Sequence, residues 1–96
     1  PTEYDDIHTK ENQPKVTITT INANSNFIEV KADITAPLNL KQVDFFLDGR
    51  LITGDSTAPY SAFLPITTQG QKHIVTVRAY DVVGNNGEKS ETVSLP

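Results

Sequence analysis

Three residues near the end of the chain, Asp81, Gly84 and Asn85, form the only motif with the character of a metal site. Calcium binds where several carboxylate and carbonyl oxygens meet, and Asp55 or Glu88 would join the set if their loops folded against Asp81. Alternatively, Asp81 accepts backbone N–H groups and caps a turn, in which Gly84 and Asn85 supply left-handed conformations. No EF-hand-like run of alternating Asp and Asn is present. We therefore expect a structural turn, with calcium as the alternative and no other cofactor.

Three aromatic side chains, Phe46, Tyr60 and Tyr80, are the candidates for ligand binding. Such rings can form a platform for sugar rings, and strand alternation directs Phe46 and Tyr80 outward. The chain has no tryptophan, and outward aromatic rings also cover neighbouring loops or face the next domain. We expect packing or interdomain contact, with sugar binding as the alternative.

The sequence offers no constellation for catalysis, so we expect no enzyme and no catalytic residue. His8 and His73 are the only histidines and cysteine is absent, which leaves zinc without its three or four ligands. We expect His8 in an N-terminal arm and His73 at a strand end. Asp5 and Asp6 are adjacent, whereas glycoside hydrolysis needs two carboxylates held about 5–10 Å apart across a cleft.

Charge and composition exclude several classes of partner. The net charge is −4, from 12 acidic and 8 basic residues of mixed order, so neither a nucleic-acid-binding stripe nor a polybasic membrane patch is present. No apolar run approaches the roughly 18–20 residues that span a bilayer. Without cysteine there is no disulfide framework. The 96 residues, which start at Pro1 and include no methionine, suit one domain cut from a longer chain.

Period-two alternation of apolar and polar residues predicts short strands along most of the chain. These strands cover 15–20, 27–34, 40–47, 50–53, 60–66, 73–80 and 89–95. With turn signals roughly every 8–12 residues and no helical period, they predict an all-β, immunoglobulin-like antiparallel β-sandwich of about seven strands in 15–96. Residues 1–14 are charged, aperiodic and bounded by prolines, and we expect a linker or lead-in arm.

Turn chemistry refines this layout. Asp48-Gly49 between two apolar runs indicates a type I′ hairpin, which needs positive φ at both central residues. The Asn/Ser-rich residues 22–26 predict a turn and 84–87 a loop. Pro65 inside a strand indicates an edge strand or a bulge. The expected inward residues of the three clearest strands are Ile28, Val30, Ala32, Ile34, Val43, Phe45, Leu47, Val75, Val77 and Ala79.

Three blocks of sequence resemble the bacterial Ig-like domains attached to surface enzymes. They are Val-Asp-Phe-Phe-Leu-Asp-Gly at 43–49, Thr-Ala-Pro-Tyr-Ser at 57–61 and Ala-Tyr-Asp-Val-Val-Gly-Asn at 79–85. That family has an aromatic-rich strand ending in Asp-Gly, a Pro-Tyr entering the next strand and an Ala-x-Asp-x-x-Gly-Asn turn. The resemblance covers about 14–96 and implies the fold, whereas the family serves many hosts and implies little chemistry.

The segment from Glu3 to Pro14 is similar to the one that follows the transpeptidase domain in some bifunctional penicillin-binding proteins. The chain has no Ser-x-x-Lys, Ser-Asp-Asn or Lys-Thr-Gly, so the chemistry of such a peptidoglycan synthase would lie upstream of Pro1. The resemblance implies a non-catalytic spacer, docking or protein-interaction module outside the cytoplasm, at the cell surface, wall or periplasm. Its partners would be adjacent domains of the parent chain. The alternative is a carbohydrate- or peptidoglycan-binding module that contacts cell-wall polysaccharide.

Overall fold

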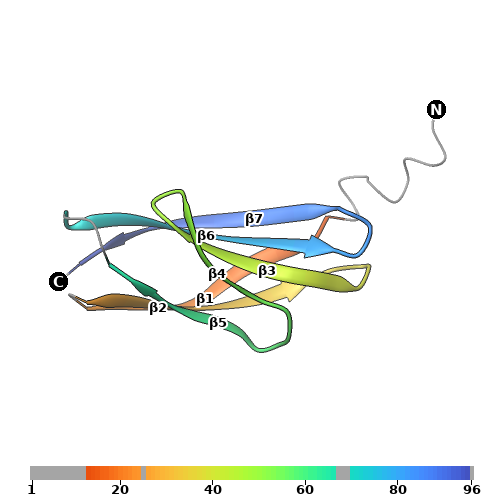
Figure 1. Cartoon of the computed structure of the whole chain (residues 1–96), viewed down its shortest axis with the longest axis horizontal. Coiled ribbons are helices and arrows are strands. Elements are labelled where there is room, and N and C mark those ends of the chain that lie inside the picture. Colours follow the sequence, from red (N-terminus) through yellow and green to blue (C-terminus); the bar gives the residue numbers. More distant parts are fainter. Residues whose placement is uncertain (1–12, 25, 67–69, 96) are drawn as a thin grey trace.

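Two antiparallel sheets make up the part of the chain that the computed structural model describes, residues 13–24, 26–66 and 70–95. The strands are β1 (Lys15–Ala23), β2 (Phe27–Thr35), β3 (Leu40–Leu47), β4 (Arg50–Asp55), β5 (Tyr60–Pro65), β6 (Lys72–Asp81) and β7 (Asn86–Ser94). One sheet has the order β1-β2-β5 and the other the order β4-β3-β6-β7. Figure 1 shows both sheets running along the long axis of the molecule. The all-β sandwich predicted from the sequence is confirmed.

The core lies between the two sheets and follows the period-two pattern of the sequence. Strands β2, β3 and β6 have a partner on each side, and their alternate residues are the most deeply buried because each strand turns one face inward. The buried apolar residues are Ile28, Val30, Ala32, Val43, Phe45, Leu47, Ala62, Leu64, Val75, Val77, Ala79 and Val93. Of the predicted inward residues in β2, β3 and β6, only Ile34 is partly buried, and it packs against this core.

Several predicted element boundaries are wrong by a few residues. β1 includes Asn22 and Ala23, which were predicted to lie in a turn but pair with β2. β4 continues to Asp55, and β7 begins at Asn86, where a loop was predicted. β1, β4 and β7 extend beyond the residues that alternate between apolar and polar, because backbone pairing with the neighbouring strand continues through polar residues.

Positive φ angles occur at the predicted hairpin turns, with one exception. Asp48 and Gly49 have φ of 54° and 83°, as a type I′ turn requires. Gly84 has φ of 94°. The prediction of a left-handed Asn85 is wrong, because Asp48 is the only non-glycine residue of positive φ in the described ranges. Pro65 ends β5, which is an edge strand as predicted.

The chain enters and leaves the sandwich at opposite ends. Pro14 is buried beside the start of β7, where a Cβ on Gly87 would overlap the Pro14 carbonyl oxygen. At the other end the Leu95 amide donates to the Gln71 carbonyl at 2.7 Å. Figure 1 shows β1 and β7 extending between these two ends. Arm residues 1–12, which include Asp5, Asp6 and His8, lie outside the described ranges.

Within the described ranges, no helix has the length and apolar content needed to cross a bilayer.

Candidate functional site

The outward face of the four-stranded sheet brings Phe46 and Tyr80 together around Arg78. The Arg78 guanidinium carbon lies 5.2 Å from the centroid of the Phe46 ring, within the range of a cation–π contact. Its Nη1 is 3.5 Å from the Tyr80 hydroxyl oxygen. Its Nε donates to Glu88 Oε1 at 2.8 Å, and Nη2 lies 2.6 Å from the same oxygen. Two of the three predicted ligand-binding aromatics therefore belong to one polar network.

Arg78 is the fixed charge of this network. Its hydrogen bond to Tyr80 is the largest cause that raises the pKa of the guanidinium above its already high value, followed by its hydrogen bond to Glu88. The guanidinium also covers one side of the Phe46 ring, which a stacked sugar would otherwise use. This arrangement favours a packing role for Phe46.

A shallow cavity of about 280 Å³ opens beside Tyr80 and is lined by Lys41, Gln42, Tyr80, Asp81, Val82 and Gly84. Next to it the Gln42 amide donates to Asp44, whose side chain is almost fully buried although it belongs to the outward face. The reason is Gly54 on β4, where a Cβ would lie only 2.8 Å from Asp44 Oδ1. The burial of Asp44 was not predicted from the sequence, because it depends on Gly54, which only the pairing of β3 with β4 places opposite Asp44.

Tyr60 does not join Phe46 and Tyr80. It lies on β5 in the other sheet, opposite Ala32 of β2, and packs partly against the core. The alternative of one sugar platform built from all three aromatics is therefore excluded, because the strand order places Tyr60 in the other sheet. Tyr60 instead lines a second cavity of about 280 Å³, together with Thr19, Lys31, Ala32, Asp33, Pro59 and Ser61.

Asp81 caps the turn between β6 and β7, as the structural interpretation of this motif predicted. Its Oδ1 accepts the backbone N–H of Val83 at 3.0 Å and of Asn85 at 2.8 Å. Its Oδ2 accepts the Asn85 side-chain amide at 2.7 Å. Burial raises the pKa of this carboxyl, but the hydrogen bonds from Asn85 and Val83 together outweigh burial and lower it. The ionised Asp81 is thus a structural element of the buried turn.

Of the proposed calcium ligands, Asp81 and Asn85 meet through their side-chain hydrogen bond, whereas Asp55 and Glu88 have other partners. Among the residues that the structure describes, no three Asp, Glu or His side chains gather where they could hold an ion. Asp55 accepts the Thr57 amide at 3.2 Å within its own loop, and Glu88 is engaged by Arg78. Calcium binding at Asp81 stays a prediction, which a thermal melt with and without a chelator tests.

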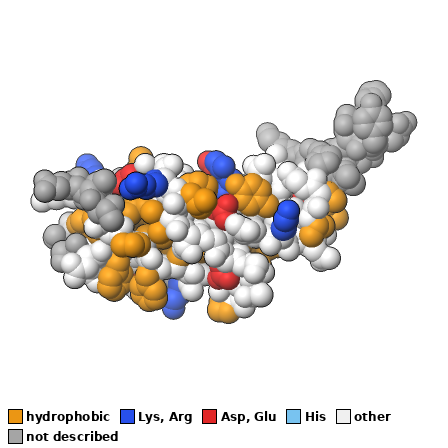
Figure 2. Space-filling view, in the orientation of Figure 1, with side chains coloured by type: hydrophobic (Ala, Val, Ile, Leu, Met, Phe, Trp, Pro, Cys, Tyr) orange, Lys and Arg blue, Asp and Glu red, His pale blue; other side chains and the backbone are white. Residues whose placement is uncertain are grey.

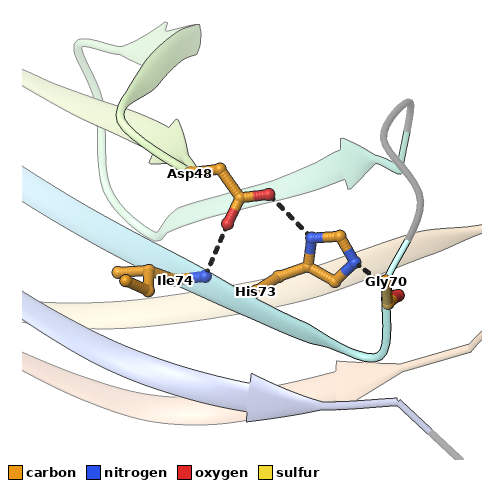
Figure 3. Close-up of polar contacts among 4 residues, drawn as sticks. All are labelled: Asp48, Gly70, His73 and Ile74. Carbon is orange, nitrogen blue, oxygen red and sulfur yellow. Dashed lines mark hydrogen bonds and ion pairs between the residues drawn. The ribbon is translucent and has the colours of Figure 1, made fainter.

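A buried histidine ties two loops together at the opposite end of β6. His73 is 1% exposed, its Nδ1 lies 2.7 Å from Asp48 Oδ2, and its Nε2 lies 3.2 Å from the Gly70 carbonyl oxygen (Figure 3). The other Asp48 oxygen accepts the Ile74 backbone N–H at 2.8 Å. The position of His73 near a strand end agrees with the prediction, whereas its contact with Asp48 was not predicted. The burial of His73 could have been predicted, because His73 lies two residues before the inward Val75 and therefore points to the same face of the strand.

We expect Asp48→Ala to lower the free energy of unfolding by about 2 kcal/mol, because a buried imidazole and a backbone N–H lose their acceptor. Alanine also tolerates the positive φ of this position poorly. Urea denaturation followed by circular dichroism measures the loss. Asp48→Asn is the matched control, since asparagine keeps an acceptor oxygen and tolerates this φ, and its loss should be smaller. Equal losses for the two variants would contradict the role of the Asp48 acceptor.

Comparison with known proteins agrees with this geometry. The sequence model of a family described as Bacterial Ig domain matches residues 14–78. A solved structure of Clostridium thermocellum CbhA fibronectin(III)-like modules superposes with a TM-score of 0.68 and 25% sequence identity. That match covers 86% of this chain and 45% of the other, so this chain spans less than half of the solved one. No curated protein matches.

Proposed function

Because the chain belongs to the bacterial Ig domain family, we propose that it is a non-catalytic accessory module of a protein that acts outside the cytoplasm. Its role would be that of a spacer or docking element between parts of a longer chain. The observation that carries this proposal is the placement of Pro14 and Leu95 at opposite ends of an elongated sandwich, whose strands Figure 1 shows. The similarity to fibronectin(III)-like modules, which form part of a longer solved chain, supports it.

A folded spacer differs from a flexible linker in orientation more than in reach. The longest principal-axis extent is 49 Å. A flexible chain from residue 14 to 95 would average roughly the same distance, about 50 Å, but with a wide distribution. The sandwich replaces that distribution with one length and one orientation, because its core fixes β1 relative to β7. The proposed mechanism is therefore mechanical.

For the parent protein we propose a peptidoglycan synthase of the penicillin-binding class. The support is the resemblance of the segment from Glu3 to Pro14, together with the frequent occurrence of such modules on proteins of the cell surface. The proposed partners are then the adjacent domains of that chain. The second candidate function is carbohydrate or peptidoglycan binding, favoured by the half-buried Tyr80 at the edge of a cavity.

Replacing residues 14–95 in the full parent chain with a Gly/Ser linker of equal residue number tests the spacer role. We expect the parent enzyme to keep its activity on small soluble substrates and to lose part of its activity on insoluble cell-wall polymer. An unrelated β-sandwich of similar length is the matched control and should restore the lost activity. Full activity with the flexible linker would contradict the proposal. Failure of the unrelated sandwich would instead point to a specific binding surface on this domain.

A further inference from the structure

The outward face of the three-stranded sheet carries an aromatic pair that the proposed spacer role does not use. Phe63 on the edge strand β5 is 62% exposed. Its ring meets Phe27 of β2 edge to face, with centroids 5.2 Å apart and planes at 85°. Phe27 therefore contacts the Phe63 ring, which stays largely exposed. Together the two rings provide apolar area for a contact on this face.

A cavity lined by both polar and apolar side chains lies two residues along β5 from Phe63. Ser61 precedes Phe63 by two residues on β5, so both side chains point outward about 7 Å apart. Ser61 pairs with Lys31 across to β2, and both line the cavity of about 280 Å³ with Thr19 and Asp33. The groove therefore offers hydroxyl, ammonium and carboxylate groups next to an apolar ring.

Acidic and basic side chains balance on this face. Glu29, Lys31 and Asp33 are the outward charged residues of β2. Lys15 of β1 shares the face through its pairing with Thr35, so the face carries two charges of each sign. Glu29 lies opposite Phe63, 4.0 Å from the Lys31 ammonium, and accepts the Asn22 amide at 3.2 Å. Charge complementarity therefore favours a neutral, polar ligand over a polyanion. On the face shown in Figure 2, likewise, hydrophobic side chains form separate groups with basic and acidic side chains between them.

We propose that this face binds a neutral polysaccharide chain, independently of the spacer role and of Phe46 and Tyr80. One sugar ring stacks its C–H surface on Phe63. The hydroxyls of the next ring hydrogen-bond Ser61, Lys31 and Asp33 in the cavity. An apolar ring provides the stacking area, and charged side chains form the stronger hydrogen bonds with hydroxyl groups. The cavity beside Phe63 adds a concave surface with a few convergent polar groups and an apolar lining of Ala32, Pro59 and Tyr60, which is the composition of a small-molecule site.

Pulldown of the whole 96-residue chain with insoluble cellulose, xylan and chitin tests the proposal, with polygalacturonate as the charged probe. We expect retention on at least one neutral polymer and a tenfold or larger loss of affinity in Phe63→Ala. Phe63→Tyr keeps the ring and should retain binding. Leu51→Ala is the matched control, because Leu51 is 56% exposed but lies on the other sheet, and it should bind like the parent. Thermal melts establish that each variant is folded.

Four outcomes overturn the proposal. They are no retention on any neutral polymer, retention unchanged in Phe63→Ala, equal losses in Phe63→Ala and Leu51→Ala, and preference for polygalacturonate. If Phe63→Ala does not fold, the 96-residue chain is titrated with cellohexaose and xylohexaose, and changes in its backbone amide NMR chemical shifts locate the binding site. Shifts confined to residues 27–33 and 61–63 support the site, and shifts elsewhere or none overturn it. Failure here leaves the spacer experiment untouched, because that test uses the parent chain and an unrelated sandwich.

Discussion

Asp81→Ala should lower the free energy of unfolding at pH 7 by about 3 kcal/mol, since three hydrogen-bond donors of a buried turn lose their acceptor. Two of these donors belong to Asn85 and one to Val83. Asp81 is itself 1% exposed, so water cannot readily replace the carboxylate. Urea denaturation of the parent and the variant at pH 7 measures the difference.

The contribution of Asp81 to the free energy of unfolding should depend on pH. The folded state lowers the pKa of Asp81, whereas an unfolded aspartate titrates near 3.9. The ionised carboxylate therefore stabilises the native state above about pH 4, and this contribution is lost as the pH falls through the folded pKa. The difference in stability between the parent and Asp81→Ala should shrink as the pH falls below the pKa of unfolded aspartate and through the lowered pKa of the folded state. Asp81→Asn keeps the shape without the charge, and its stability should vary less with pH. A parent-to-alanine difference that is constant from pH 2 to 7 would contradict this account.

The burial of the core was predictable because it follows a local rule. Alternate side chains of a strand point to opposite faces, so Val43, Phe45 and Val77 could be placed inward from parity alone. The hairpin at Asp48 was predictable because few residue pairs tolerate positive φ at both positions. Strand ends were less predictable, since β7 begins at Asn86 through pairing with β6 rather than through its own apolar pattern.

The candidate site was predictable only in part, because it depends on strand order. Nothing local shows that Tyr60 belongs to a different sheet from Phe46 and Tyr80. The burial of His73 depends on Asp48, which lies 25 positions away in the chain. The outward direction of Phe63, in contrast, was predictable from the sequence, because Phe63 lies between the apolar Ala62 and Leu64 on a strand whose side chains alternate between faces.

Phe45→Ala should lower the free energy of unfolding by about 3–5 kcal/mol, the largest effect expected of any single substitution here. Phe45 is fully buried on β3, between Thr53 of β4 and Val77 of β6, and its loss leaves a cavity that the paired strands cannot close. A domain of this size has about 5–15 kcal/mol of total stability, so a large part of it would be lost. Thermal and urea unfolding of the two proteins measure the change.

The neighbouring residue provides the control. Phe46 has the same side chain on the same strand, but it is directed outward, is half-buried and contacts Arg78. Phe46→Ala removes that contact, worth about 0.5–1 kcal/mol at an exposed site, and some apolar packing. Its total cost should remain well below that of Phe45→Ala. Equal losses at the two positions would mean that β3 does not present one face to the core. A large difference would show that the cost depends on the direction of the ring, since chemistry and strand are the same.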